Sequence, residues 1–166
     1  MKTLSRIWRH LVTTGADARR VFPPATLNAI QKTIAKGETL HRAEVRLVIE
    51  PSLSIQMVLN GTSSRERALE LFAIHGIWDT EENCGVLVYI ELADHKVEIV
   101  ADRAANRVIS EAEWKDVCQT MTSGFARKVY GESVIAALEK LNALLHSRFP
   151  DDGSRPNQLS DQPIML

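Results

Sequence analysis

Hydrophobic positions recur along the chain with two periods, one typical of strands and one typical of helices. The segment 44–50 alternates apolar and polar residues, which is the period of a strand. A nearly continuous apolar run at 86–92 and a second run at 95–101 follow each other closely, and they predict a β-hairpin that turns at residues 93–95. Because a helix joins 44–50 to 86–92, these two strands are expected to be parallel and adjacent, and the sheet to be mixed.

Helical spacing dominates the rest of the chain and has clear start signals. Capping boxes at 63–66 and 110–113 predict two helix starts. Apolar residues with helical spacing also follow the proline pair at 23–24 and recur through 134–145. Helices before, between and after the strands would cover both faces of the sheet, so the predicted fold class is α/β, a three-layer α/β/α sandwich with a small mixed sheet.

The pattern divides the chain into three parts. Residues 1–22 are a basic amphipathic helix with an apolar stripe formed by Leu4, Ile7, Trp8 and Leu11. We expect this stripe to dock on the domain; peripheral contact of residues 1–20 with a membrane or a protein partner is the alternative. Residues 23–149 form one domain, and residues 150–166, with three prolines and little periodicity, are expected to be a disordered tail.

Charge and cysteine content exclude several classes of protein. The net charge of −1, from 20 basic and 21 acidic residues, argues against a nucleic-acid-binding protein, although residues 1–20 alone carry +4. Cys84 and Cys118 are too few and too far apart for a disulfide framework or a zinc site. With no secretory signal and no apolar stretch near the roughly 20 residues that cross a bilayer, we expect a cytoplasmic protein.

The stretch "GIWDTEENCGVLVYI" (76–90) gathers polar side chains directly before a buried strand: Asp79, Glu81, Glu82 and Asn83. Such oxygens suit a hard divalent cation, but a solvated turn is the alternative. An EF-hand is excluded, because Cys84 and Ile90 stand where that loop needs Gly and Glu.

Signals for nucleophilic catalysis are weaker. Cys84 follows His75 closely in the sequence, but no spacing identifies an activated thiolate. Cys118 lies on an apolar helix face and is expected to pack in the core. The other histidines are dispersed, and we expect surface or capping positions for His10, His41, His95 and His146.

The segment "ALELFAIHGIWDTEENCGVLVYIELADHKVEIVADRAANRVI" (68–109) resembles the centre of the TPM domain. It is closest to a soluble bacterial branch that retains a "WDTE-x-N" loop and "ADH-x-VEIVADR". The resemblance extends over about residues 23–148. It implies an α/β/α fold, divalent-metal binding near the loop and, in some plant members, acid phosphatase activity.

Residue by residue, the resemblance implies a site that has lost carboxylates. Asp79 matches the first loop acid of the family, whereas Asn83 stands where a second Asp is usual and Asn106 falls in a replaced Gly-Tyr-Gly-Leu-Glu element. The resemblance thus implies metal ligands Asp79 and Asp102, and a ligand-binding set of Glu82, Asn83, Arg103 and Asn106.

These replacements favour one function over another. Amides attract a divalent cation less than carboxylates do, so we expect at most weak binding of Ca²⁺ or Mg²⁺. The predicted function is a cytoplasmic TPM-domain binding or accessory module, with an unidentified protein partner and little or no catalysis. The alternative is a metal-assisted acid phosphatase acting on phosphate monoesters.

Overall fold

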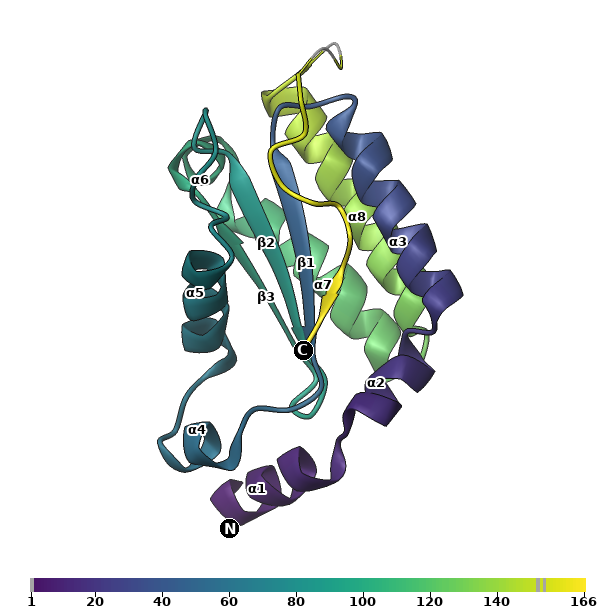
Figure 1. The fold of residues 1–166 in the computed structure, drawn as a ribbon, viewed down its shortest axis with the longest axis vertical. Helices are drawn as coiled ribbons and strands as arrows, with labels where there is room; N and C mark the ends of the chain where they lie inside the picture. The colour runs from purple at the N-terminus through teal and green to yellow at the C-terminus, as the bar shows by residue number, and fades with distance from the viewer. Residues whose placement is uncertain (1, 152, 154) are drawn as a thin grey trace.

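The computed structural model describes residues 2–151, 153 and 155–166, and Figure 1 shows their fold. The helices are α1 (Lys2–Val12), α2 (Gly15–Val21), α3 (Pro24–Glu38), α4 (Ile55–Leu59), α5 (Ser64–Ile74), α6 (Arg103–Val108), α7 (Glu111–Ala126) and α8 (Tyr130–Arg148). The strands are β1 (Glu44–Glu50), β2 (Gly85–Glu91), β3 (Lys96–Ala101) and β4 (Ile164–Met165). None of the described helices is both long and apolar enough to cross a membrane.

The strands form one mixed sheet in the order β3-β2-β1-β4. β1 pairs with β2 in parallel, and β2 pairs with β3 antiparallel. The structure therefore confirms the adjacent parallel pair, the hairpin and the mixed sheet that the sequence predicts.

The hairpin defines two ends of the sheet. Val86, near the start of β2, lies opposite Ala101 at the end of β3, so both are at the same end. We call this the loop end, because the loop of residues 75–84 and the start of α6 lie there (Figure 1). The opposite end, at the turn of residues 92–95 between β2 and β3, is called the hairpin end.

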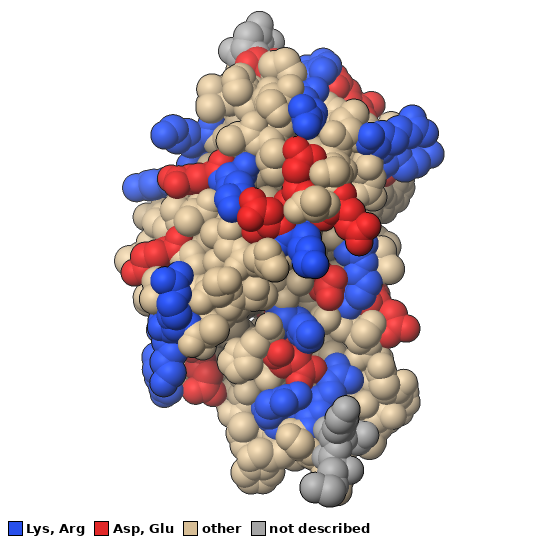
Figure 2. Space-filling model, turned by 180° about the vertical axis from the view of Figure 1, so that it is seen from behind, with Lys and Arg blue, Asp and Glu red and all other residues tan. Residues whose placement is uncertain are grey.

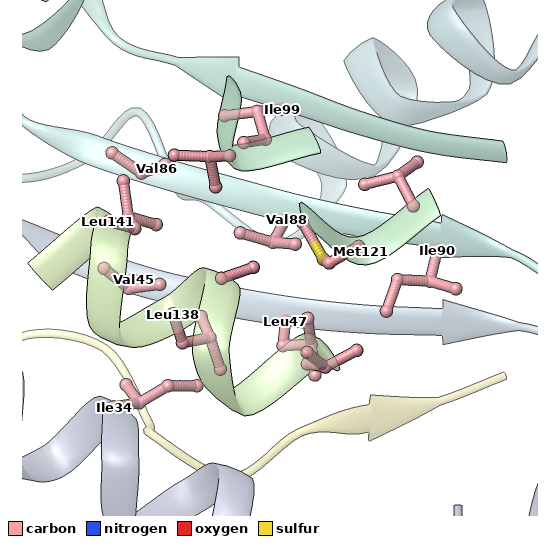
Figure 3. Close-up of a cluster of buried hydrophobic side chains, with 14 of the residues drawn as sticks. Ile34, Val45, Leu47, Val86, Val88, Ile90, Ile99, Met121, Leu138 and Leu141 are labelled. Atoms are coloured by element: carbon pink, nitrogen blue, oxygen red, sulfur yellow. The ribbon is translucent and has the colours of Figure 1, made fainter. Parts of the chain in front are cut away.

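Side chains alternate across the sheet and make both of its faces apolar. Val86 and Val88 belong to a buried cluster with side chains of α3, α7 and α8 (Figure 3), whereas Leu87 and Tyr89 pack with α5 on the other face. Figure 1 shows these helices on the two sides of the sheet. The result is the predicted three-layer α/β/α sandwich.

Helix start signals act as the sequence predicts. Ser63 Oγ accepts a hydrogen bond from Glu66 N at 3.1 Å, and Glu66 Oε2 accepts one from Ser63 N at 2.7 Å, which completes a capping box for α5. Ser110 and Glu113 make the same reciprocal pair for α7. These bonds satisfy backbone N–H groups that a helix start leaves without partners.

A buried polar network crosses from the sheet to α5. Glu50, at the end of β1, accepts a hydrogen bond from the Tyr89 hydroxyl at 2.6 Å and pairs with Arg67 through Nη2 at 2.8 Å and Nε at 3.0 Å. Burial and the hydrogen bond to Glu50 raise the pKa of Tyr89, so its hydroxyl keeps its proton and acts as a donor. Every polar oxygen of this network thus has a partner inside the protein.

The C-terminal segment corrects one expectation. Residues 155–166 run beside β1, and β4 pairs with it in parallel, Val48 opposite Ile164. Arg46 also donates to the backbone oxygens of Ser160 and Gln162. The expectation of a disordered tail is therefore wrong for these residues, because β1 offers an unpaired edge that the tail can occupy.

The N-terminal segment corrects a second expectation. It forms two helices, with Thr14 capping α2 through a further capping box with Asp17. α1 docks against the domain, but Leu4, Trp8 and Leu11 remain exposed and its polar side faces inward. Docking of the apolar stripe is therefore wrong, because buried charged partners hold the helix by its other face.

Candidate functional site

The loop of residues 75–84 consists of two tight turns. Asp79 N donates to Gly76 O, and Asn83 N donates to Thr80 O. Gly76 and Asn83 both have positive φ, 61° and 53°, which Gly adopts freely and Asn tolerates better than most residues. Thr80 is buried, and its hydroxyl accepts a hydrogen bond from Cys84 N at 3.1 Å. The loop is therefore held by its own backbone.

The start of α6 lies against this loop. Asp102 N donates to Gly85 O at 2.8 Å, and Ala104 N donates to Asn83 O at 3.0 Å. The Asp102 carboxylate caps α6 by accepting a hydrogen bond from Arg103 N at 2.7 Å. Folding of the hairpin thus brings residues about twenty positions apart in the sequence into one polar cluster.

Three of the predicted site residues meet in this cluster. The Arg103 guanidinium donates through Nη2 to Asn83 Oδ1 at 3.1 Å, and its Nε lies 3.8 Å from Asp102 Oδ1. Asp102 is buried, and its second oxygen, Oδ2, has no hydrogen-bond partner among the residues that the structure describes. Asn106 lies on the same short helix but donates to Ala101 O at 3.0 Å. The exposed Arg103 side chain thus places a positive charge beside both Asn83 and Asp102.

The other two predicted residues point elsewhere. Glu82 forms ion pairs with Arg42 and with Arg155 of the C-terminal segment, so it faces the β1 side of the loop. Asp79 is exposed, and within the described part of the chain its carboxylate forms no hydrogen bond or ion pair with Asp102. Both lie at the loop end, but they do not complete the cluster around Arg103.

Cys84, His10 and His41 are buried and have partners inside the protein. Burial raises the pKa of the Cys84 thiol to about 11, and its Sγ lies 3.2 Å from Arg42 O, so it is not an activated thiolate. His41 is buried and its ring nitrogens contact Ala43 O and Asn142 Oδ1. The expectation of surface positions is therefore wrong for His41, as it is for the buried His10.

A cavity of about 280 Å³ lies beside the loop, and the sequence analysis did not anticipate it. It is lined by α3, the start of β1 and the C-terminal segment, and it contains Glu38, Glu44 and Asp161. Burial, and then a hydrogen bond with Asp161, raise the pKa of Glu38 to about 10. No local pattern could reveal this group, because Glu44 and Asp161 are far apart in the sequence.

A second polar cluster lies at the hairpin end. Ligand atoms of His10, Glu91 and Asp94 lie within 4.8 Å of one another, a spacing that a metal ion could use. However, Arg6 Nε and Arg9 Nη2 each lie 2.6 Å from an Asp94 oxygen. Two guanidinium charges at this distance oppose a cation. We call Arg6, Arg9, His10 and Asp94 the Asp94 clamp, because they fasten α1 to the hairpin.

Comparison with known proteins places the chain in a family. The sequence model described as "TPM domain" matches residues 16–144, more than three quarters of the chain. The chain belongs to the TPM domain family. The match covers the loop, the hairpin and α6, so the cluster around Arg103 lies inside the TPM domain. No curated protein matches the sequence significantly.

The solved structures agree with this assignment at the level of the fold. The NMR structure of the BA42 protein from the psychrophilic bacterium Bizionia argentinensis is similar with a TM-score of 0.76. The similarity covers 86% of this chain and 93% of BA42, at 20% sequence identity. At this identity the likeness shows the shared fold alone.

Proposed function

We propose that this TPM-domain protein is a binding or accessory module with a reduced ligand site at the loop end and with little or no catalysis. The proposal rests on the Arg103 guanidinium, which lies 3.1 Å from Asn83 Oδ1 and 3.8 Å from Asp102 Oδ1. An exposed arginine of the protein itself thus places its positive charge beside two positions that the family resemblance links to metal binding.

The donors at the loop end fit a divalent cation poorly. Asn83 supplies a neutral amide that is already hydrogen-bonded to Arg103, and the Asn106 amide donates to the backbone. Calcium sites gain affinity from the number of charged ligands, and a guanidinium nearby repels a further cation. Of the acids in the predicted set, Glu82 is paired with Arg42 and Arg155, so Asp79 and Asp102 remain as carboxylate donors.

The exposed groups at the loop end suit a macromolecular partner instead. Trp78, in the loop, is 55% exposed, and the Arg103 side chain, beside the loop, is 77% exposed. Trp and Arg are the residue types that most often anchor protein interfaces. A cytoplasmic location belongs to this proposal, and the free thiols of Cys84 and Cys118 support it.

One observation favours the alternative function, a metal-assisted phosphatase for phosphate monoesters. Within the described part of the chain, Asp102 Oδ2 is buried without a hydrogen-bond partner, next to the exposed guanidinium of Arg103. A carboxylate and an arginine in contact recur at phosphate sites. The poor cation fit ranks this alternative second.

Titration with Ca²⁺ and Mg²⁺ tests the proposal, with loop amide shifts as one readout and phosphatase turnover as the other. The parent should bind weakly and hydrolyse no phosphate monoester. The double variant Asn83→Asp, Arg103→Gln adds a carboxylate and removes the positive charge of Arg103. It should therefore tighten the binding of Ca²⁺ or Mg²⁺ at least about tenfold. Arg107→Gln removes an exposed arginine from the same helix and is the matched control.

Two results would contradict the proposal. Equal affinity of the parent and the double variant would show that Arg103 does not oppose a cation at this site. Phosphatase turnover by the parent that disappears in Asp79→Asn would establish the alternative function instead.

A further inference from the structure

α1 is fastened to the domain by its polar side. In the Asp94 clamp, Arg6 and Arg9 hold the two carboxylate oxygens of Asp94. Leu53 N donates to Nδ1 of the buried His10 at 2.9 Å, which leaves the proton of the neutral ring on Nε2, 3.2 Å from Asp94 Oδ2. These contacts fix the rotation of the helix about its own axis.

The fixed rotation turns the apolar side of α1 outward. Leu4, Trp8 and Leu11 are 73%, 66% and 57% exposed. With 3.6 residues per turn, positions 4, 8 and 11 share one side of a helix, and positions 6 and 10 lie on the opposite side. Leu59 of the neighbouring α4 is 58% exposed and adds to the apolar surface at this end of the molecule. We call Leu4, Trp8, Leu11 and Leu59 the outer apolar face.

Positive charge is concentrated in the same part of the chain. Residues 1–20 carry a net charge of +4 while the whole chain carries −1, so the remaining residues carry −5. Arg19 and Arg20 of α2 are exposed, and Arg9 is half-exposed. Figure 2 shows blue side chains gathered around a small red group at the lower end of the molecule, the end where α1 lies in Figure 1. This end therefore complements a negatively charged surface.

We propose that the outer apolar face, together with the exposed Arg19 and Arg20 of α2, binds the surface of an anionic lipid bilayer. A helix with apolar residues that include Trp on one side and basic residues beside them suits the interface between headgroups and acyl chains. The face is the outer surface of a helix and not a groove, so it presents side chains to be inserted. Negatively charged lipids attract these arginines. The remaining residues of the chain carry a net charge of −5 and add no attraction to such a surface.

The Asp94 clamp orients the outer apolar face before the protein meets a membrane. A free amphipathic peptide loses conformational freedom when it becomes helical on a membrane, whereas α1 is already folded and oriented. Binding therefore depends on the few exposed side chains, and it should be reversible and sensitive to salt.

Vesicle co-sedimentation of the full chain tests the proposal. The parent should bind vesicles of mixed phosphatidylglycerol and phosphatidylcholine, should lose binding as salt is raised, and should bind vesicles of phosphatidylcholine alone far less. Trp8→Ala should weaken binding at least about tenfold, because it removes the largest inserted side chain. Trp78→Ala is the matched control, since it removes another exposed tryptophan at the opposite end and should leave vesicle binding unchanged.

A charge variant and a fold control complete the experiment. Replacing Arg19 and Arg20 by Gln should weaken binding to the anionic vesicles about tenfold or more. All variants alter exposed side chains, so each should melt at the parental temperature. No binding by the parent, or equal binding by Trp8→Ala and Trp78→Ala, would overturn the proposal. It would also be overturned if Trp8→Ala converted a dimer into a monomer without affecting vesicles, because a second copy of the chain would then be the occupant.

Discussion

The network of Tyr89, Glu50 and Arg67 predicts an unequal response to removing its two donors. Tyr89→Phe removes one hydrogen bond to a buried carboxylate, but Arg67 still contacts both oxygens of Glu50 at 2.8–3.3 Å. The expected cost is about 2 kcal/mol, within the range for hydrogen bonds to charged groups. For a chain of this size that corresponds to a melting temperature lower by about 4–8 °C.

Arg67→Leu should cost considerably more. It leaves the buried Glu50 carboxylate with Tyr89 as its one side-chain partner in the described structure. Breaking a buried pair by removing one partner costs about 3–5 kcal/mol, because the remaining charge stays desolvated.

Urea unfolding of the two variants at neutral pH, beside a matched Tyr→Phe control, measures these differences. Tyr130 suits the control, because its hydroxyl makes no hydrogen bond within the described residues. Tyr130→Phe should therefore leave the unfolding free energy almost unchanged. Equal costs for Tyr89→Phe and Tyr130→Phe, or a smaller cost for Arg67→Leu than for Tyr89→Phe, would refute the reasoning.

Three further predictions concern the sheet and its two ends. Val88→Asp buries an unpaired carboxylate in the central strand and should cost several kcal/mol, about 4 or more, whereas Leu69→Asp on the exposed side of α5 should cost less than about 1, as urea unfolding would show. Burial raises the pKa of Glu91 from 4.5 to about 7, so the folded state holds a proton that the unfolded chain releases. Stability should fall by up to about 3 kcal/mol as pH rises from about 4.5 to 7, and Glu91→Gln should remove that loss in a pH series of melting curves. Asp102→Ala removes the cap of α6 and should destabilise by about 0.5–2 kcal/mol, whereas Asp102→Asn retains a capping oxygen and should cost less.

Features that depend on near neighbours in the sequence could be predicted. The hairpin, the parallel pair and the two capping boxes each follow from residues within one or two elements, and the structure confirms them. β4 could not be predicted, because two residues give no periodic pattern and their partner Val48 lies more than a hundred positions away. The short helix α6 was likewise not anticipated, although Asp102 before Arg103 is an ordinary helix cap.

The orientation of α1 shows where pattern analysis alone is insufficient. An apolar stripe normally faces the core. Here the Asp94 clamp joins residues more than eighty positions apart and rotates α1 so that its apolar stripe faces outward. The candidate site was predictable in part. The family resemblance selected Asn83, Asp102 and Arg103, which the fold brings together. The pairing of Glu82 with Arg42 and Arg155 depends on the C-terminal segment and had no signal in the sequence.

The pairing of β4 with β1 has a consequence for self-association. An open strand edge can pair with the same edge of another molecule and seed aggregation. β4 covers β1 at positions 48–49, and the new outer strand is two residues long and preceded by Pro163. Short strands and nearby prolines are poor templates for further pairing. The C-terminal residues therefore protect the edge of β1 from pairing with another molecule. A brief detachment of the two residues of β4 would be enough to expose that edge.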